Sequence, residues 1–90
     1  MFRLWAKLFK DNHMLRDMEV QNGDMTLNRT RKIYKAIEEV CYEFDLAQPV
    51  WLQNTITEFQ RQDKCRFTKD NFMEEIDFDY LEIQVLEEDY

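Results

Sequence analysis

The sequence contains one glycine and one proline among 90 residues, which leaves almost no material for long flexible segments. It also lacks any run approaching the ~18 apolar residues that a membrane-spanning helix needs. In the opening stretch MFRLWAKLFK, Lys7 and Lys10 interrupt the apolar core that an export signal would require. We therefore expect a single cytoplasmic domain, residues 1–90, that makes no contact with a membrane.

Residues that commonly carry catalysis or bind metals are also scarce. His13 is the only histidine, and Cys41 and Cys65 follow no Cys/His spacing of a zinc site. Lys64 and Arg66 flank Cys65, and neighbouring cations lower the pKa of a thiol, but no base or orienting partner accompanies it. We expect no enzymatic activity, no metal and no cofactor, and the sequence leaves open whether Cys65 is reactive.

The first third of the chain alternates with a period of two, which predicts a β-hairpin. FRLWAKLFK and MLRDMEVQ form its strands, and the segment Asp11-Asn12-His13 has the composition of a turn. The side chains expected to face the core from this hairpin are Leu4, Ala6, Leu8, Met14, Met18 and Val20.

From Thr26 onward the apolar spacing changes to that of a helix, whose start Thr26 or Asn28 can cap. Its apolar stripe comprises Ile33, Ala36, Ile37, Val40, Cys41 and Phe44. Pro49 ends any continuation and is a favourable first residue for a second helix through WLQNTITEFQRQ.

The segment after the second helix is expected to be irregular. KCRFTKD is polar and is predicted to be a loop. The stretch from Asn71 to Glu74 fits a capping box, which predicts one or two further helical turns that bury Phe72, Met73 and Ile76.

The last twenty residues, NFMEEIDFDYLEIQVLEEDY, hold eight carboxylates and no lysine or arginine. Alternation predicts a strand that begins near Asp79 and buries Leu81, Ile83 and Val85. Because a half-buried strand must expose polar residues on its other face, we interpret most of these acids as the solvated side of that strand.

The predicted fold class is α+β, a two-layer sandwich in which a β-hairpin is followed by two helices and a C-terminal strand. The sheet is expected to have three strands, with the last strand beside the first, and helices on one face only.

Most of the chain, including the hairpin-like start, resembles a known family. The stretches WLQNTITEFQRQDKCRF and DNFMEEIDFDYLEIQVLEED, together with the EEVCYEFDL helix, are similar to a family of short uncharacterised bacterial proteins, and IDFDYLEI is the most specific part. The resemblance implies a bacterial cytoplasmic setting. It carries no assigned activity, so it implies no site residue.

The distribution of charge suggests an alternative function, that of a regulator that binds an anion, a nucleotide or nucleic acid through the basic first half of the first helix. The net charge is −7, yet residues 1–35 hold eight Lys/Arg against four Asp/Glu. The cations of the first helix crowd its first half and its acids the second, which is the reverse of what the helix dipole favours. The cations considered for anion binding are Arg29, Arg31, Lys32, Lys64 and Arg66. Pairing of these cations with the protein's own acids is the favoured alternative, and the negative charge argues against nucleic acid as a partner.

The uncovered face of the sheet provides the leading functional hypothesis. If Leu4 and Leu8 face the helices, aromatic residues of the first and last strands lie on the opposite face. A contiguous apolar patch usually marks an interface, unless other parts of the chain fold over it. The predicted interface residues are Trp5, Phe9, Tyr80 and Leu86. We expect a protein-interaction module that binds a protein partner or a second copy of itself.

Overall fold

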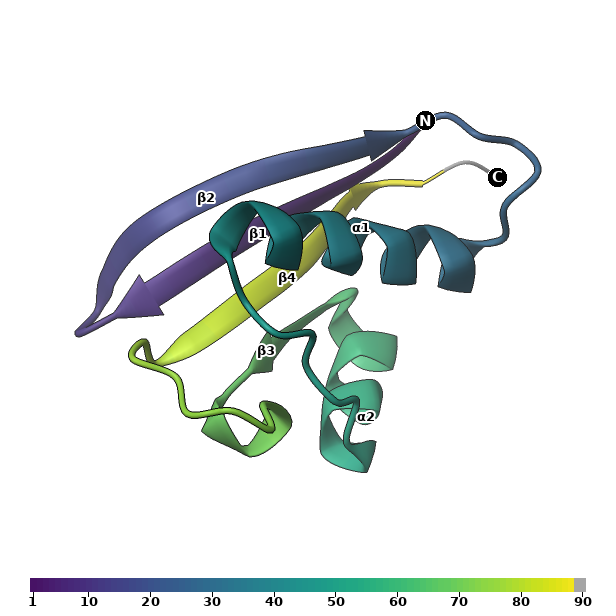
Figure 1. Ribbon diagram of the computed structural model, residues 1–90. Coiled ribbons are helices and arrows are strands. Elements are labelled where there is room, and N and C mark those ends of the chain that lie inside the picture. The colour runs from purple at the N-terminus through teal and green to yellow at the C-terminus, as the bar shows by residue number, and fades with distance from the viewer. Residues whose placement is uncertain (89–90) are drawn as a thin grey trace.

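The computed structural model describes residues 1–88. Its elements, in chain order, are β1 (Phe2–Lys10), β2 (His13–Asn22), α1 (Arg29–Phe44), α2 (Gln53–Gln62), β3 (Lys64–Phe67), a short 3-10 helix (Lys69–Asn71) and β4 (Tyr80–Glu87). The strands form one antiparallel sheet in the order β2-β1-β4-β3 (Figure 1). The α+β class is confirmed, but the sheet has four strands instead of the expected three.

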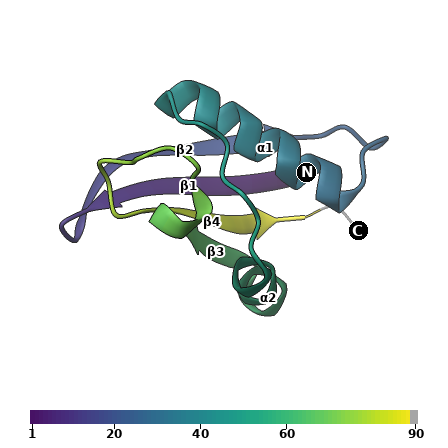
Figure 2. The same cartoon turned by 60° about the horizontal axis from the view of Figure 1, so that its bottom comes forward.

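The two helices cover the same face of this sheet. α1 packs against β1 and β2, and α2 packs against β3 (Figure 2). From β1, Leu4, Ala6 and Leu8 point toward the helices and are buried, as predicted. An aromatic cluster joins α2 to β3, because Trp51 makes edge contacts with Phe59 and Phe67 at centroid distances of 5.6 and 5.0 Å. The opposite face of the sheet is not covered by any element of residues 1–88.

The central pair of strands agrees with the sequence prediction. β4 lies beside β1, with Leu8 opposite Leu81 and Ala6 opposite Ile83. Leu81 and Ile83 are fully buried, and Val85 packs against the core. β4 begins at Tyr80, one residue after the expected Asp79. The last strand therefore buries the predicted row of apolar side chains.

The hairpin differs from the prediction at one position. Asp11 and Asn12 form its two-residue turn, both with positive φ, which suits the right-handed twist of a hairpin. A register shift pairs Leu8 with Arg16 but Phe9 with Met14, so Leu15 is an extra residue in β2. Beyond such a bulge the strand changes face. The expectation that Met14 faces the core is therefore wrong.

Helix α1 confirms its predicted stripe. All six residues of that stripe are buried. Asn28 is the N-cap, and its side chain accepts a hydrogen bond from the Arg31 amide. The helix ends at Phe44, and its C-cap residue Asp45 adopts the left-handed conformation and donates its amide to the carbonyls of Cys41 and Tyr42.

The prediction that Pro49 begins the second helix is wrong, because α2 begins at Gln53. Tertiary hydrogen bonds hold the preceding segment in a non-helical conformation. The Val50 amide donates to the Asn71 carbonyl at 2.6 Å, and Asn71 Nδ2 donates to the Val50 carbonyl at 2.9 Å. Asn71 thereby joins two loops that are far apart in sequence.

The prediction of a loop at KCRFTKD is also wrong, since Lys64–Phe67 forms the edge strand β3. Cys65 and Phe67 are fully buried and pair with Ile83 and Leu81 of β4. A four-residue strand with two charged side chains shows too little alternation to be recognised alone. Pairing with β4 supplies the stabilisation.

The capping box lies three residues earlier than predicted. Thr68 caps the short 3-10 helix, and the side chain of Asn71 accepts a hydrogen bond from the Thr68 amide at 3.0 Å. Residues 72–79 contain no further helical turn. Phe72 is buried and Ile76 packs against the core, but Met73 is 87% exposed, so its predicted burial is wrong.

Candidate functional site

The open face of the sheet brings together most of the predicted interface. The register places the outward side chains in four rows across the strands: Glu19, Trp5, Gln84 and Lys64; Asp17, Lys7, Glu82 and Arg66; Met14, Phe9 and Tyr80; and Gln21, Arg3 and Glu87. Leu86 lies at a register shift beside the first row and is 42% exposed.

Glu82 is the centre of the open face. Its carboxylate lies 2.8 Å from Lys7 Nζ and 3.1 Å from Arg66 Nε. The side chains of Lys7 and Glu82 are only 12% and 10% exposed, whereas that of Arg66 is 56% exposed. Burial acts to raise the pKa of Glu82, but the hydrogen bonds from Lys7 and Arg66 outweigh it and hold that pKa below its ordinary value.

The aromatic residues of this face are already engaged within the chain. Trp5 Nε1 donates to Asp17 at 2.8 Å, and Lys7 Nζ lies 4.0 Å from the centroid of a Trp5 ring. Phe9 stacks on Tyr80 at 5.0 Å, and Tyr80 in turn lies under the guanidinium of Arg66. These half-buried side chains form an ordered array of intramolecular contacts, and an interface on them stays a prediction.

The cations proposed for anion binding are distributed over two regions. Arg29 pairs with Asp63 at 2.7 Å and with Glu88, which immediately follows β4. Arg29 thus pairs with the protein's own acids, and both the hydrogen bond and the charge of Glu88 help to raise the pKa of Arg29.

The other cations differ in environment. Lys32 is buried on α1 and Arg31 is exposed on it, while Lys64 and Arg66 belong to the open face of β3. Anion binding by these residues stays a prediction.

The two thiols are buried and protonated. Burial raises the pKa of Cys41 to about 11 and, with the nearby charges of Glu58 and Glu82, raises that of Cys65 to about 12. Alternation along β3 explains why the flanking cations do not activate Cys65, because its neighbours point to the opposite face. His13 is exposed beside the hairpin turn. The geometry therefore provides no activated thiolate at neutral pH.

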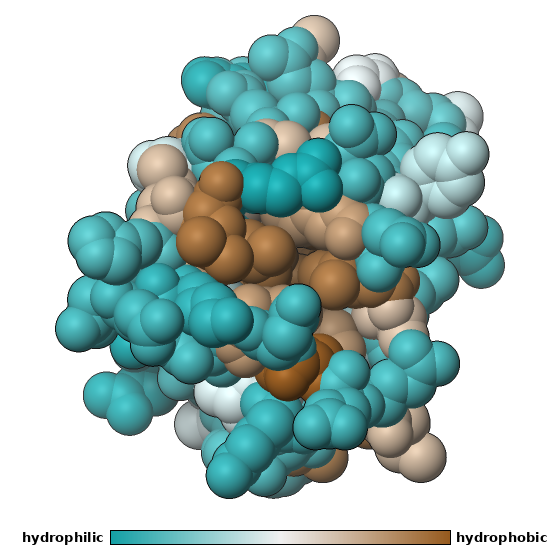
Figure 3. All heavy atoms as spheres, turned by 60° about the vertical axis from the view of Figure 1, so that its left-hand side comes forward, coloured by the Kyte–Doolittle hydropathy of each residue, from teal (hydrophilic) through white to brown (hydrophobic). Residues whose placement is uncertain are grey.

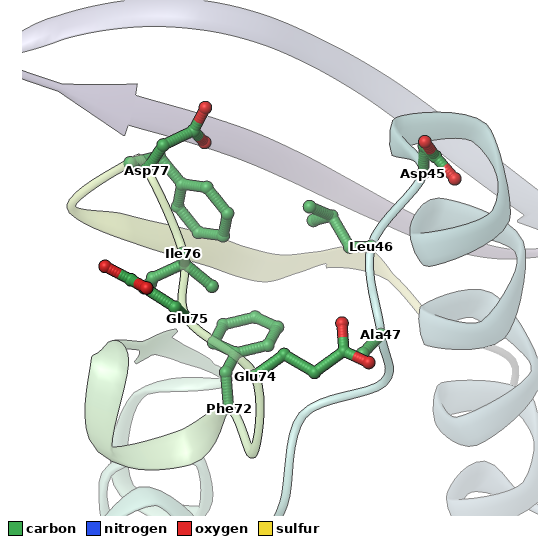
Figure 4. A pocket seen from close by; sticks show the side chains of 9 residues that line it. Asp45, Leu46, Ala47, Phe72, Glu74, Glu75, Ile76 and Asp77 are labelled. Atoms are coloured by element: carbon green, nitrogen blue, oxygen red, sulfur yellow. The ribbon is translucent and has the colours of Figure 1, made fainter.

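A hollow at one end of the molecule was not predicted from the sequence. It has a volume of about 410 Å³ and lies between the end of α1 and the loop before β4 (Figure 4). The apolar lining consists of Leu46, Ala47, Phe72, Ile76 and Phe78. The rim carries Asp45, Glu74, Glu75 and Asp77, and no lysine or arginine lines it. We call these nine residues the acidic hollow.

The acidic hollow presents part of its apolar lining to solvent, since Leu46, Ala47 and Ile76 are half-buried while Phe72 and Phe78 are buried. Figure 3, which brings forward the left-hand side of Figure 1, shows hydrophobic atoms in a depression bordered by hydrophilic ones. In Figure 4 Leu46 faces Ile76 across the hollow, and the side chain of Glu74 reaches toward Ala47. The carboxylates of Glu75 and Asp77 point away from the apolar lining (Figure 4).

The four rim carboxylates differ from the acids of the sheet. Glu19, Glu82 and Glu87 each pair with an arginine or lysine. None of the rim carboxylates makes a hydrogen bond or ion pair with another residue in the part of the chain that the structure describes (residues 1–88). Within residues 1–88, these three acids of the sheet have cationic partners, whereas the four acids of the hollow have none.

One of these acids belongs to a pattern visible in the sequence. Asp45, the C-cap residue of α1, follows the acids of the second half of that helix, which oppose the helix dipole and indicate that stability alone did not select them. The acids at positions 74–77 carried no such signal, because they were indistinguishable from the polar side of a strand.

Comparisons with known proteins identify no relative: no family model matches the chain, and no curated protein or solved structure matches it. The resemblance to short bacterial proteins stays a prediction. Within residues 1–88, no helix is both long and apolar enough to cross a membrane. The same residues contain no group of three or more His, Cys, Asp or Glu side chains arranged to hold a metal ion.

Proposed function

We propose that this protein is a non-enzymatic protein-interaction module and that the acidic hollow is its docking site. The observation that carries the proposal is the combination of an open apolar lining with four carboxylates that have no counter-ion among residues 1–88. Exposed apolar patches rimmed by polar residues usually mark interaction sites. The thiols are buried and protonated, which favours binding over nucleophilic catalysis.

The charge of the rim defines the chemistry of the partner. An incoming arginine or lysine would place its cation among the carboxylates and its aliphatic stem along the apolar lining, as such side chains do on other surfaces. A second copy of the chain would present the same unpaired carboxylates and the same net charge of −7. The hollow therefore favours a basic, partly apolar segment of a different protein over a homodimer.

Two fluorescent peptides of equal length test this proposal. One is acetyl-Leu-Arg-Phe-Arg-Leu-amide, and the other has glutamine in place of each arginine. We expect the arginine peptide to bind at low salt and the glutamine peptide to bind more weakly, as measured by fluorescence anisotropy. Added salt should weaken binding of the arginine peptide more than binding of the glutamine peptide, because the ion pairs between arginine and the rim carboxylates are close to solvent.

Variants of the rim locate the binding. The change Glu74→Gln with Asp77→Asn should weaken the arginine peptide by about two- to five-fold for each carboxylate, which corresponds to ~0.4–1 kcal/mol per exposed pair. The matched control, Asp11→Asn with Asp70→Asn, removes two exposed acids outside the hollow and should leave affinity unchanged.

Two results would contradict the proposal. If the rim variant binds as wild type does, the hollow is not the docking site. If phenethylamine displaces the peptide at a similar concentration, the hollow is better assigned to a small amine than to a protein segment.

A further inference from the structure

A second surface, on the edge of the sheet, has an unpaired backbone. β2 is an edge strand of ten residues, and most of its side chains are exposed. On the flank away from β1, its backbone makes no hydrogen bond to any residue between 1 and 88. Such a flank is a template for another strand, because main-chain groups of an added segment can continue the ladder.

A groove lies beside this flank, between β2 and α1. Its volume is about 510 Å³, and its lining includes Met18 from β2 and Tyr42, Glu38, Glu39 and Glu43 from α1. Tyr42 is 87% exposed, so its ring is available for contact. The three glutamates make no ion pair within the part of the chain that the structure describes.

Two cations lie near the groove, and their positions determine the net charge of its lining. Lys35 is the one basic residue of its lining. Arg16 lies over the ring of Phe44 and donates to the backbone carbonyl of Glu43 at 3.5 Å, leaving the Glu43 carboxylate unpaired. The lining therefore has a net negative charge.

The acids on the other face of β2 disfavour one candidate for the added strand, a second copy of β2 paired at its middle. Asp17 and Glu19 both point to the open face. Two copies of β2 could pair antiparallel so that the helices of both copies stay on the same side of the joined sheet. In that arrangement each outward residue of one copy lies opposite an outward residue of the other. Every such register centred on residues 17–19 places Asp17 or Glu19 opposite an acid of the second copy, which is unfavourable.

We propose that the β2 edge accepts an extended basic segment of a partner protein by strand addition. Main-chain hydrogen bonds to β2 would provide affinity for any extended segment, whatever its sequence. Alternate side chains of the segment would enter the groove toward Glu38, Glu39 and Glu43 and provide specificity. The proposal is independent of the acidic hollow, with which the groove shares no residue.

The test uses the peptide acetyl-Lys-Val-Lys-Val-Lys-Val-Lys-amide and the same peptide with every backbone nitrogen methylated. Methylation keeps the charges but removes the donors that a β-ladder requires. We expect only the unmethylated peptide to bind. By NMR hydrogen exchange, alternate amides of residues 13–22 should gain protection when it binds.

Matched variants separate this surface from the acidic hollow. Glu38→Gln with Glu43→Gln should weaken the unmethylated peptide by about two- to five-fold for each carboxylate, whereas Glu74→Gln with Asp77→Asn should not change its affinity. Equal binding of both peptides, absence of alternate protection in β2, or no binding at low salt would each overturn strand addition. If the protein alone sediments as a dimer and the β2 amides are protected from hydrogen exchange in it, the edge binds a second copy of the chain and the proposal of a basic partner segment is overturned.

Discussion

Replacing Glu82 with glutamine would measure how strongly the central ion pairs of the open face stabilise the fold. The change removes the carboxylate that Lys7 Nζ contacts at 2.8 Å, while Lys7 itself stays only 12% exposed. Breaking a fully buried pair costs about 3–5 kcal/mol. Lys7 also lies 3.5 Å from Gln84 Oε1, and the face borders water, so we expect a smaller loss of about 2 kcal/mol.

The Arg66 contact adds little to this loss. Its side chain is 56% exposed, and exposed pairs contribute about 0.2–1 kcal/mol. Arg66→Gln should therefore lower the free energy of unfolding by less than half as much as Glu82→Gln does. Urea unfolding followed by tryptophan fluorescence is the assay, and with an m value of ~1 kcal/mol/M the Glu82 variant should unfold at a midpoint about 2 M lower.

A paired apolar replacement and a pH series provide the controls. Lys7→Met with Glu82→Leu should be nearly as stable as wild type, because an apolar pair avoids the cost of burying two charges. Since the native pKa of Glu82 is lowered, its stabilisation is present above the unfolded value of ~4.3 and is lost as pH falls through the native value. The difference between wild type and Glu82→Gln should shrink over that range. Equal effects of the Glu82 and Arg66 variants, or a pH-independent difference, would refute this account.

Three other predictions concern the loops and the core. Asn71→Ala should lower stability by about 2–3 kcal/mol in urea unfolding, because it removes a buried side chain that donates to the Val50 carbonyl and to the Thr55 hydroxyl; a loss below ~0.5 kcal/mol would contradict this role. Cys41 and Cys65 should not react with a thiol reagent in the native protein at pH 8 but should both react in urea, and rapid native labelling would show that burial does not protect them. Asn12→Gly should stabilise the protein by about 0.5–1 kcal/mol, because φ is 65° there, and an unchanged thermal midpoint would argue against strain at this turn.

Helices and strands whose apolar residues recur with a regular period over many residues were predictable from the sequence. The spacing of Ile33, Val40 and Phe44 follows the helical period, and all three are buried as expected. The alternation around Leu4 in β1 and Leu81 in β4 assigned the core side of both central strands. In each case the side chains repeat along the chain with the geometry of the element itself, so no knowledge of distant partners was needed.

Features that depend on distant partners were predicted wrongly or not at all. β3 is a strand because Cys65 and Phe67 pair with β4, and the hairpin bulge at Leu15 changes the face of Met14. Pro49 does not begin a helix because Asn71, far along the chain, binds the adjacent backbone.

The candidate binding sites belong to the same group of features. The acidic hollow joins the end of α1 to the loop before β4, and the edge groove joins α1 to β2. The sequence by itself determined the periodic elements, their buried faces and the excess of acid, because these follow from local geometry and composition. Only the tertiary structure decided which acids acquire counter-ions and which surround exposed apolar surface, because that depends on contacts between segments far apart in the chain.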